Sequence, residues 1–324
     1  MKLSVYMITR NEAARLARTL EQAKKVADEI IVVDSGSTDS TVEIAKSFGA
    51  KTFFHEWNSY CDQKHYAERL CENDFVLMLD ADEVLSDSLN IKYALLPGDP
   101  ARLDKIAAFL TDVEQLAFNR EYRSLRGRYH GTDVLAVSTG IGGSSASIAV
   151  EELHKIGVEA MIRIGSCGAM QTGIRIGDLI IACGAVRDDG ASQAYVDLRF
   201  PAVPDTTLLN ACVKTAAENG FAHHIGIVHS HESFYIDDNA EQQAFWSKKG
   251  VLGADMETAA LFTVGRLRGV KTASILNNVV EYGGNTADSI GGYVDGESLT
   301  QQGERNEILT ALNAFELLNA TENS

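Results

Sequence analysis

Short apolar runs alternate with segments of helical spacing along the first 90 residues. The runs are rich in β-branched residues, as in strands buried on both faces, whereas residues 11–29 repeat apolar positions at helical spacing. We expect that helix to begin at Asn11, a good N-cap, and a second helix to end at Gly49. The expected strands are residues 3–9, 30–34, 50–54 and 74–80. Strands and helices in alternation predict a parallel sheet.

The same alternation restarts near Leu89 and continues through the rest of the chain. Expected strands cover residues 91–97, 122–131, 132–140, 159–165, 178–186, 224–230 and 270–277, and expected helices cover residues 98–110, 146–157, 256–269 and the chain from about residue 299. The polar segment 86–90 is the one plausible boundary between the two series. The sequence therefore predicts two α/β domains, residues 1–90 and 91–324.

Composition and charge narrow the class of protein. The chain has 324 residues, of which 45% are hydrophobic, and a formal net charge of -16, which argues against a broad surface for nucleic acid or anionic membrane. Its five cysteines include no CxxC pair, which favours a reducing compartment. No segment approaches the ~20 apolar residues of a membrane span. We expect a cytoplasmic protein without a membrane span.

Carboxylates follow two of the strands expected in the first domain. Asp34 ends the strand at residues 30–34, and Asp80 and Asp82 follow the strand at residues 74–80. Ligands of open α/β sheets bind at the carboxyl ends of the strands. Two carboxylates one residue apart suit Mg²⁺ or Mn²⁺ bridging to a diphosphate, although a lone Asp-x-Asp is more often a solvated turn.

This domain resembles the family 2 inverting glycosyltransferases, especially those of lipopolysaccharide core synthesis, through "YMITRNEAARL", "IIVVDSGSTDST" and "VLMLDADEVLS". The resemblance implies the nucleotide-sugar-binding half of a GT-A-like fold, with Asp34 on the nucleotide and Asp80 and Asp82 on the metal. It also implies a following half with an acceptor site and a catalytic base, which this chain lacks. We therefore expect a truncated βαβ half with a vestigial metal site.

An anion site is indicated in the second domain. Gly98 lets the backbone approach an anion, Asp99 and Pro100 suit the start of a helix, and Arg102 in its first turn offers a fork of donors. An ordinary capped helix would have the same pattern. Arg163 lies in an apolar strand, where an arginine seldom occurs without a partner anion. Glu257 opens an apolar helix and could accept hydrogen bonds from two hydroxyl groups.

Several segments together resemble the nucleoside phosphorylase family, and within it the uridine phosphorylases. They are "PGDPAR", "NREY", "STGIGGSSASIAVEEL", "RIGSCGA", "RDDGAS", "FPAVPD" and "MET", in family order from about Tyr93 onward. The resemblance implies a three-layer α/β/α domain. It implies phosphorolysis of a nucleoside, with uridine preferred, to free base and ribose 1-phosphate in nucleoside salvage. Phosphate is then a co-substrate, and no cofactor is required.

The resemblance also implies roles for individual residues. Arg102, Arg163 and Glu257 would be catalytic. Phosphate would be held by Gly98, Arg102, Arg163, Ser166 and, from a neighbouring subunit, Arg120; ribose by Met256 and Glu257; and the base by Cys167, Gly168, Phe234, Asn277 and Asn278. The role of Arg120 implies a homo-oligomer built from dimers, up to a hexamer.

Three departures from the family pattern bear on specificity. The Gln-x-Arg pair that reads the uracil edge is replaced by "IDDNAEQQ", where Gln242 or Gln243 could substitute. Asn277 or Asn278 stands where the family has an acid or arginine for the leaving base. The N-terminal histidine for the ribose 5′-hydroxyl is missing. Four alternatives therefore stay open: a purine nucleoside phosphorylase, a glycosyltransferase acting through the first domain, a nucleosidase using water, and a non-catalytic binding protein.

Overall fold

The computed structural model describes residues 2–82, 91–284 and 298–322. The chain divides into two compact units, Met1–Leu89 and Asn90–Ser324, and each is described by itself. The boundary expected at residues 86–90 lies outside the described residues. None of the described helices is both long and apolar enough to cross a membrane.

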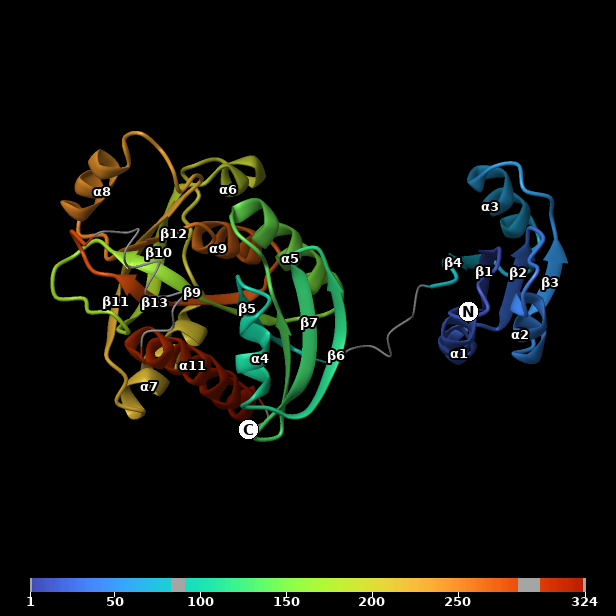
Figure 1. Cartoon of the computed structure of the whole chain (residues 1–324), viewed down its shortest axis with the longest axis horizontal. Coiled ribbons are helices and arrows are strands. Elements are labelled where there is room, and N and C mark those ends of the chain that lie inside the picture. The colour runs from blue at the N-terminus through green and yellow to red at the C-terminus, as the bar shows by residue number, and fades with distance from the viewer. Residues whose placement is uncertain (1, 83–90, 285–297, 323–324) are drawn as a thin grey trace. The chain divides into compact units, whose positions relative to one another are not determined.

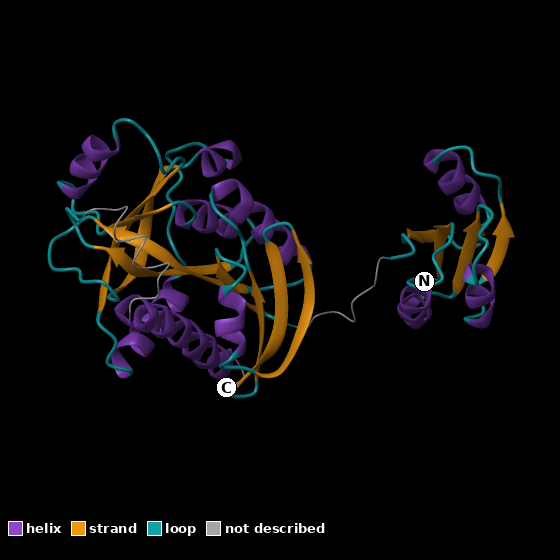
Figure 2. Cartoon of the chain, in the orientation of Figure 1, coloured by secondary structure: helices purple, strands orange, loops and turns teal. Residues whose placement is uncertain are grey.

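Unit 1 is a parallel sheet of four strands in the order β3-β2-β1-β4, with three helices (Figures 1 and 2). Its strands are β1 (Leu3–Thr9), β2 (Glu29–Asp34), β3 (Lys51–Phe54) and β4 (Phe75–Met78), and its helices are α1 (Leu16–Val26), α2 (Thr41–Ser47) and α3 (Tyr60–Arg69). This parallel sheet confirms the prediction made from the alternation of strands and helices. The β-branched run of β2 is buried from Ile30 to Asp34, as expected for a central strand.

The first helix begins later than expected. Asn11 has a left-handed φ of 58°, and its side-chain Oδ1 accepts the N–H of Thr38 at 2.8 Å. The residue therefore fixes a loop onto the turn after β2 rather than capping a helix. The helix begins at Leu16, after a turn in which the N–H of Arg15 and that of Leu16 both donate to the carbonyl of Glu12.

Unit 2 is built on a mixed sheet of nine strands in the order β12-β11-β10-β13-β9-β5-β8-β7-β6. The short β12 pairs with β11 and also with β9, so that five of these strands close into a ring. The strands are β5 (Tyr93–Pro97), β6 (Thr111–Asn119), β7 (Tyr122–Tyr129), β8 (Thr132–Val137), β9 (Ala160–Ala169), β10 (Leu179–Asp188), β11 (His223–His231), β12 (Gly253–Asp255) and β13 (Lys271–Val280).

Helices cover both sides of this sheet, which gives the three α/β/α layers expected. Figure 1 shows α7 and α11 on one side and α5, α6 and α9 on the other. The helices are α4 (Arg102–Ala107), α5 (Gly143–Lys155), α6 (Gly190–Tyr195), α7 (Thr206–Glu218), α8 (Asn239–Ser247), α9 (Thr258–Leu267) and α11 (Ser298–Glu322). The main core lies between the sheet and α11, where Ile162 and Ile164 of β9 pack with Ile308, Leu312 and Phe315.

Three neighbouring strands determine where side chains can converge. β5 and β13 both run parallel to β9, so the carboxyl ends of all three strands meet at one edge of the sheet. The chain leaves β5 through Gly98 into the turn before α4, and β12 delivers the start of α9 to the same edge. A crevice at the carboxyl ends of parallel strands is the usual ligand site of such sheets.

Candidate active site

A cavity of about 750 Å³ opens at this edge of unit 2. Its lining comes from the turn after β5, the end of β9, the loop after β11, the start of α9 and the end of β13. The volume lies in the range of small-molecule sites. Among the residues expected to form the site, Gly98, Arg102, Arg163, Ser166, Cys167, Gly168, Phe234, Met256 and Glu257 line the cavity.

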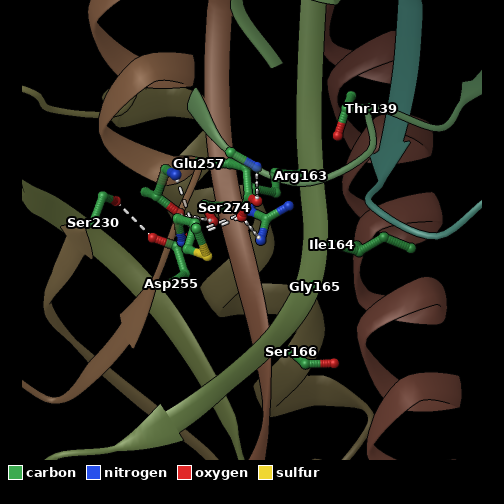
Figure 3. Close-up of polar contacts among 12 residues, drawn as sticks. Thr139, Arg163, Ile164, Gly165, Ser166, Ser230, Asp255, Glu257 and Ser274 are labelled. Atoms are coloured by element: carbon green, nitrogen blue, oxygen red, sulfur yellow. Dashed lines mark hydrogen bonds and ion pairs between the residues drawn. The ribbon is translucent and has the colours of Figure 1, made fainter. Parts of the chain in front are cut away.

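Arg163 is a buried cation of the cavity wall, with 5% of its surface exposed. Its Nε donates to Asp255 Oδ2 at 3.0 Å, and its Nη2 lies 2.5 Å from Glu257 Oε2 (Figure 3). Its Nη1 is buried and has no hydrogen-bond partner among the described residues. A buried donor without a partner is costly, so this nitrogen is poised to bind an acceptor within the cavity.

Asp255 fixes the orientation of Arg163. One carboxylate oxygen accepts the hydroxyl of Ser230 at 2.6 Å, and the other accepts the N–H and the hydroxyl of Thr258 at 3.0 and 2.6 Å. Every one of these contacts is buried, which makes the aspartate a rigid support for the guanidinium. We did not expect Asp255 from the sequence. Its position directly before Met256 and Glu257 was the available signal.

Glu257 stands at the N-cap position of α9 with 5% of its surface exposed. Its Oε1 accepts the N–H of Gly142 at 2.6 Å. Burial raises the pKa of Glu257 above its usual range, although Arg163 beside it acts in the opposite direction. The carboxylate therefore sits between a fixed cation and the cavity, where it can accept hydrogen bonds from a ligand.

Arg102 lies at the start of α4 with 4% of its surface exposed. Its Nη2 is 3.4 Å from the hydroxyl of Ser166. Asp99, expected as the cap of this helix, instead accepts the N–H of Ala101 at 2.8 Å in the preceding turn. The guanidinium also contacts two glutamates of α11, Glu304 and Glu307, which the sequence did not suggest.

Two glycines keep the backbone of the cavity wall open. A Cβ added to Gly98 would lie 3.1 Å from the carbonyl oxygen of Gly140. A Cβ added to Gly165 would lie 2.6 Å from Arg163 Nη2. Both distances are shorter than ordinary van der Waals contacts, so a side chain at either position would displace the groups that line the cavity.

The cavity wall also includes aromatic and amide side chains. Phe234 lies there with Gln242 and Gln243, the amides considered as substitutes for the missing pair. Burial raises the pKa of the Cys167 thiol well above its usual value, so Cys167 is a neutral wall residue rather than a nucleophile. His229, which the sequence analysis missed, also lines the cavity.

His229 projects from β11 and is 2.8 Å from Asp188 through its Nε2. Its ring packs against Trp246 with the centroids 5.3 Å apart. Burial lowers the pKa of His229 despite the nearby carboxylate, so the neutral imidazole is favoured. His231, two residues later on the same strand, lines the cavity as well. Residues two apart on a strand face the same side, so the spacing of His229 and His231 was the sequence signal for this pair.

Three of the expected site residues do not lie in the cavity. The side-chain amide of Asn277 donates to the carbonyl of Thr300, and that of Asn278 donates to the carbonyl of Arg175, at 2.9 and 3.0 Å. Arg120 is exposed, with a left-handed φ of 54°, in the tight turn between β6 and β7. Within one copy of the chain, none of these three side chains lines the cavity.

The carboxylates expected to bind a nucleotide and metal in unit 1 have other partners. Asp34 Oδ2 accepts the N–H groups of Gly36 and Ser37 at 2.9 and 2.8 Å. Asp80 lies 3.8 Å from Lys64, and Asp82 lies 3.5 Å from Arg15. No cluster of three or more His, Cys, Asp or Glu side chains suited to a metal occurs within residues 2–82, 91–284 and 298–322. The metal site expected at Asp80 and Asp82 therefore stays a prediction.

Two family models match the chain. The phosphorylase superfamily model matches residues 92–292, and the model of glycosyl transferase family 2 matches residues 4–95. The two matches correspond to the two resemblances that the motifs indicated.

Individual relatives agree with the larger match. A guanosine phosphorylase of Halorubrum lacusprofundi is 41% identical over 182 residues, which are 56% of this chain and 75% of that protein. A uridine phosphorylase of Thermococcus kodakarensis is 41% identical over 196 residues, 57% of this chain and 71% of that protein. The crystal structure of a uridine phosphorylase from Vibrio fischeri superposes with a TM-score of 0.66 and 45% identity, covering 71% of this chain and 95% of that one.

Proposed function

Because the chain belongs to the phosphorylase superfamily, we propose that unit 2 catalyses phosphorolysis of a nucleoside in the cytoplasm, with uridine preferred. Uridine phosphorylases are prominent among the relatives, and the Vibrio fischeri structure shares 45% identity. The observation that carries the proposal is the pair of buried arginines, Arg102 and Arg163, on the wall of one cavity. The reaction would convert nucleoside and phosphate to free base and ribose 1-phosphate.

Phosphate is proposed to bind between Gly98, Arg102, Arg163 and Ser166. The free Nη1 of Arg163 supports this assignment because it offers a donor at the cavity wall. Arginine forks match the geometry of phosphate oxygens and neutralise their charge without a metal. A side chain at Gly98 or Gly165 would crowd Gly140 or Arg163, so the two glycines keep these groups of the cavity wall in place.

Ribose is proposed to bind at Met256 and Glu257, with its hydroxyl groups donating to the glutamate. A phosphate oxygen then forms a bond to C1′ as the bond from C1′ to the base nitrogen breaks and its electron pair leaves with the base. The sugar becomes cationic in the transition state, and the phosphate dianion and Glu257 stabilise that charge. The base leaves as an anion that takes a proton from solvent or from the protein.

The base is proposed to contact Cys167, Gly168 and Phe234, with Gln242 or Gln243 reading its polar edge. These residues all line the cavity, which supports the assignment. A guanosine phosphorylase and a uridine phosphorylase are each 41% identical to this chain, so a purine substrate is the second candidate. Hydrogen-bonding groups in a polar site discriminate strongly between bases, so a direct comparison of substrates decides the question.

Arg120 is proposed to complete the phosphate site of a neighbouring subunit in a homo-oligomer. Its exposed position in the β6–β7 turn supports this role, because the side chain is accessible to a second copy of the chain. In an isologous dimer each copy would supply Arg120 to the other.

The test is base release from uridine, thymidine, guanosine, inosine and adenosine, each with and without inorganic phosphate. We expect phosphate-dependent release, fastest from uridine. Release that is independent of phosphate would indicate hydrolysis, and no release from any nucleoside would indicate a binding protein. Either result would overturn the proposal.

A further inference from the structure

Two glutamates of α11 lie directly behind the arginine at the start of α4. Arg102 Nε is 2.7 Å from Glu304 Oε1, and Arg102 Nη1 is 3.2 Å from Glu307 Oε1. Lys105 also pairs with Glu304, at 2.5 Å. Glu304 thus has two cationic partners, whereas Arg102 is the one cation paired with Glu307 among the described residues.

Glu307 is fully buried and incompletely hydrogen-bonded. Its Oε2 accepts the N–H of Gly165, a residue of the cavity wall, at 3.1 Å. Its Oε1 is within ion-pair distance of Arg102 but lacks hydrogen-bond geometry to any described residue. Burial without a hydrogen bond to one oxygen destabilises the charged form of a carboxylate and so favours its protonation.

The charged groups around the cavity do not include the excess of cations that would favour the binding of a dianion. Four buried carboxylates, Asp255, Glu257, Glu304 and Glu307, face three cations, Arg102, Arg163 and Lys105. With every group ionised, the cluster therefore carries a net charge of -1 before any anion binds. A dianion that binds the two arginines adds two further negative charges at low dielectric, and a proton on one carboxylate offsets part of this repulsion.

We propose that Glu307 is a positioning residue that, in its ionised form, holds Arg102 while the cavity is empty, and that this form takes up a proton when an oxyanion binds that arginine. The proton comes from bulk water and resides on Oε1 until the anion leaves. This inference rests on the proposed function, in which the oxyanion is phosphate. It makes anion affinity depend on a residue that does not touch the anion.

The direction of the effect follows from the groups that act on Glu307. Burial raises the pKa of Glu307 to about 8, and Glu304 of α11 adds to the increase, whereas Arg102 of α4, Arg163 of β9 and the N–H of Gly165 oppose it. Cys167 of β9 also interacts with Glu307, and its thiol is neutral. Glu307 is therefore neutral below about pH 8 and charged above it. Anion affinity should fall as the pH rises through this value.

Inorganic sulfate is the appropriate probe because it remains a dianion throughout this pH range and does not itself titrate. Calorimetric titration of the full chain in two buffers of different ionisation enthalpy counts the protons taken up on binding. At pH 8 we expect about half a proton per sulfate in the wild type. Glu307→Gln should abolish the uptake, and Glu316→Gln, at a partly exposed position on the same helix, should retain it.

The pH dependence provides the second readout. As the pH rises, wild-type sulfate affinity should fall in total by about tenfold for each unit by which sulfate binding raises the pKa of Glu307. At pH 9.5, Glu307→Gln should bind sulfate more tightly than the wild type. Sulfate binding without proton uptake in the wild type would overturn this inference, whether or not the variant folds, as would uptake that persists in Glu307→Gln. Failure of both sulfate and phosphate to bind would overturn the proposed function instead.

Discussion

At the scale of single residues, the proposed reaction depends on the ion pair of Arg163 and Glu257 at the cavity wall. If these groups stabilise the transition state as proposed, Arg163→Ala and Glu257→Ala should each lower kcat/KM by about 10²- to 10³-fold, the usual effect of removing one preorganised electrostatic group. Steady-state kinetics with uridine and phosphate measures this. Arg126→Ala, in an exposed pair with Glu114, is the matched control and should retain activity.

Loss of folding must be separated from loss of function in these variants. Removing Arg163 leaves two buried carboxylates unpaired, which costs about 3–5 kcal/mol of stability. Arg163→Lys retains the charge and loses the planar fork, so it should fold and still bind phosphate poorly. Near-wild-type kinetics in Arg163→Lys and Glu257→Ala together would refute the assignment.

Nine of the twelve residues expected to hold phosphate, ribose or base line the cavity, and two of them stood out because their chemistry is unusual for their surroundings. An arginine in an apolar strand and a glutamate opening an apolar helix both led to the cavity. Asn277 and Asn278 were less predictable, because which side of β13 each residue faces depends on the register with β9. The structure directs their amides to backbone carbonyls outside the cavity.

At the scale of elements, β9 carries both Arg163 and Gly165, and the absence of a side chain at Gly165 leaves space for the guanidinium of Arg163. Gly165→Ala should displace the guanidinium, since the new Cβ would lie 2.6 Å from Nη2, and should raise KM for phosphate with little change in unfolding temperature. Gly184→Ala is the control, because its Cβ would meet nothing closer than 3.6 Å. Equal phosphate KM in the two variants would contradict the close packing inferred here.

Elements without a clear apolar pattern were the hardest to predict. Eight of the nine residues of β6 are exposed, so this strand lacks the buried alternation that marks β7 and β8. The glutamates of α11 illustrate a related difficulty. Glu304 and Glu307 are three residues apart and so share a helix face, but charged residues so spaced usually mark a solvated face. Only the packing of α11 against β9 shows that this face is buried.

At the scale of the whole molecule, the role proposed for Arg120 predicts a site shared between subunits. Arg120→Ala and Arg163→Ala should each be nearly inactive alone. Mixed after dissociation and reassembly, they should recover about a quarter of wild-type activity, because half of the dimers are hybrids with one intact site each. An activity assay on the mixture tests this, and a mixture no more active than its components would argue that Arg120 acts within its own chain or not at all.

Unit 1 offers the second prediction at this scale. Asp34 accepts hydrogen bonds from backbone N–H groups of the turn that follows it, and Asp80 and Asp82 lie beside cations. UDP with Mn²⁺ should therefore not raise the unfolding temperature of the full chain. Differential scanning calorimetry measures this shift. A clear stabilisation by UDP and Mn²⁺ together, beyond that by Mn²⁺ alone, would show that the nucleotide-sugar site is functional.

The central claim is that inorganic phosphate, and not water, attacks the nucleoside in the cavity of unit 2. Phosphorus NMR of the full chain with uridine and phosphate follows both substrates at once. Our account predicts that one sugar phosphate forms, and one inorganic phosphate disappears, for each uracil released. Release of uracil while the inorganic phosphate signal stays constant would contradict it.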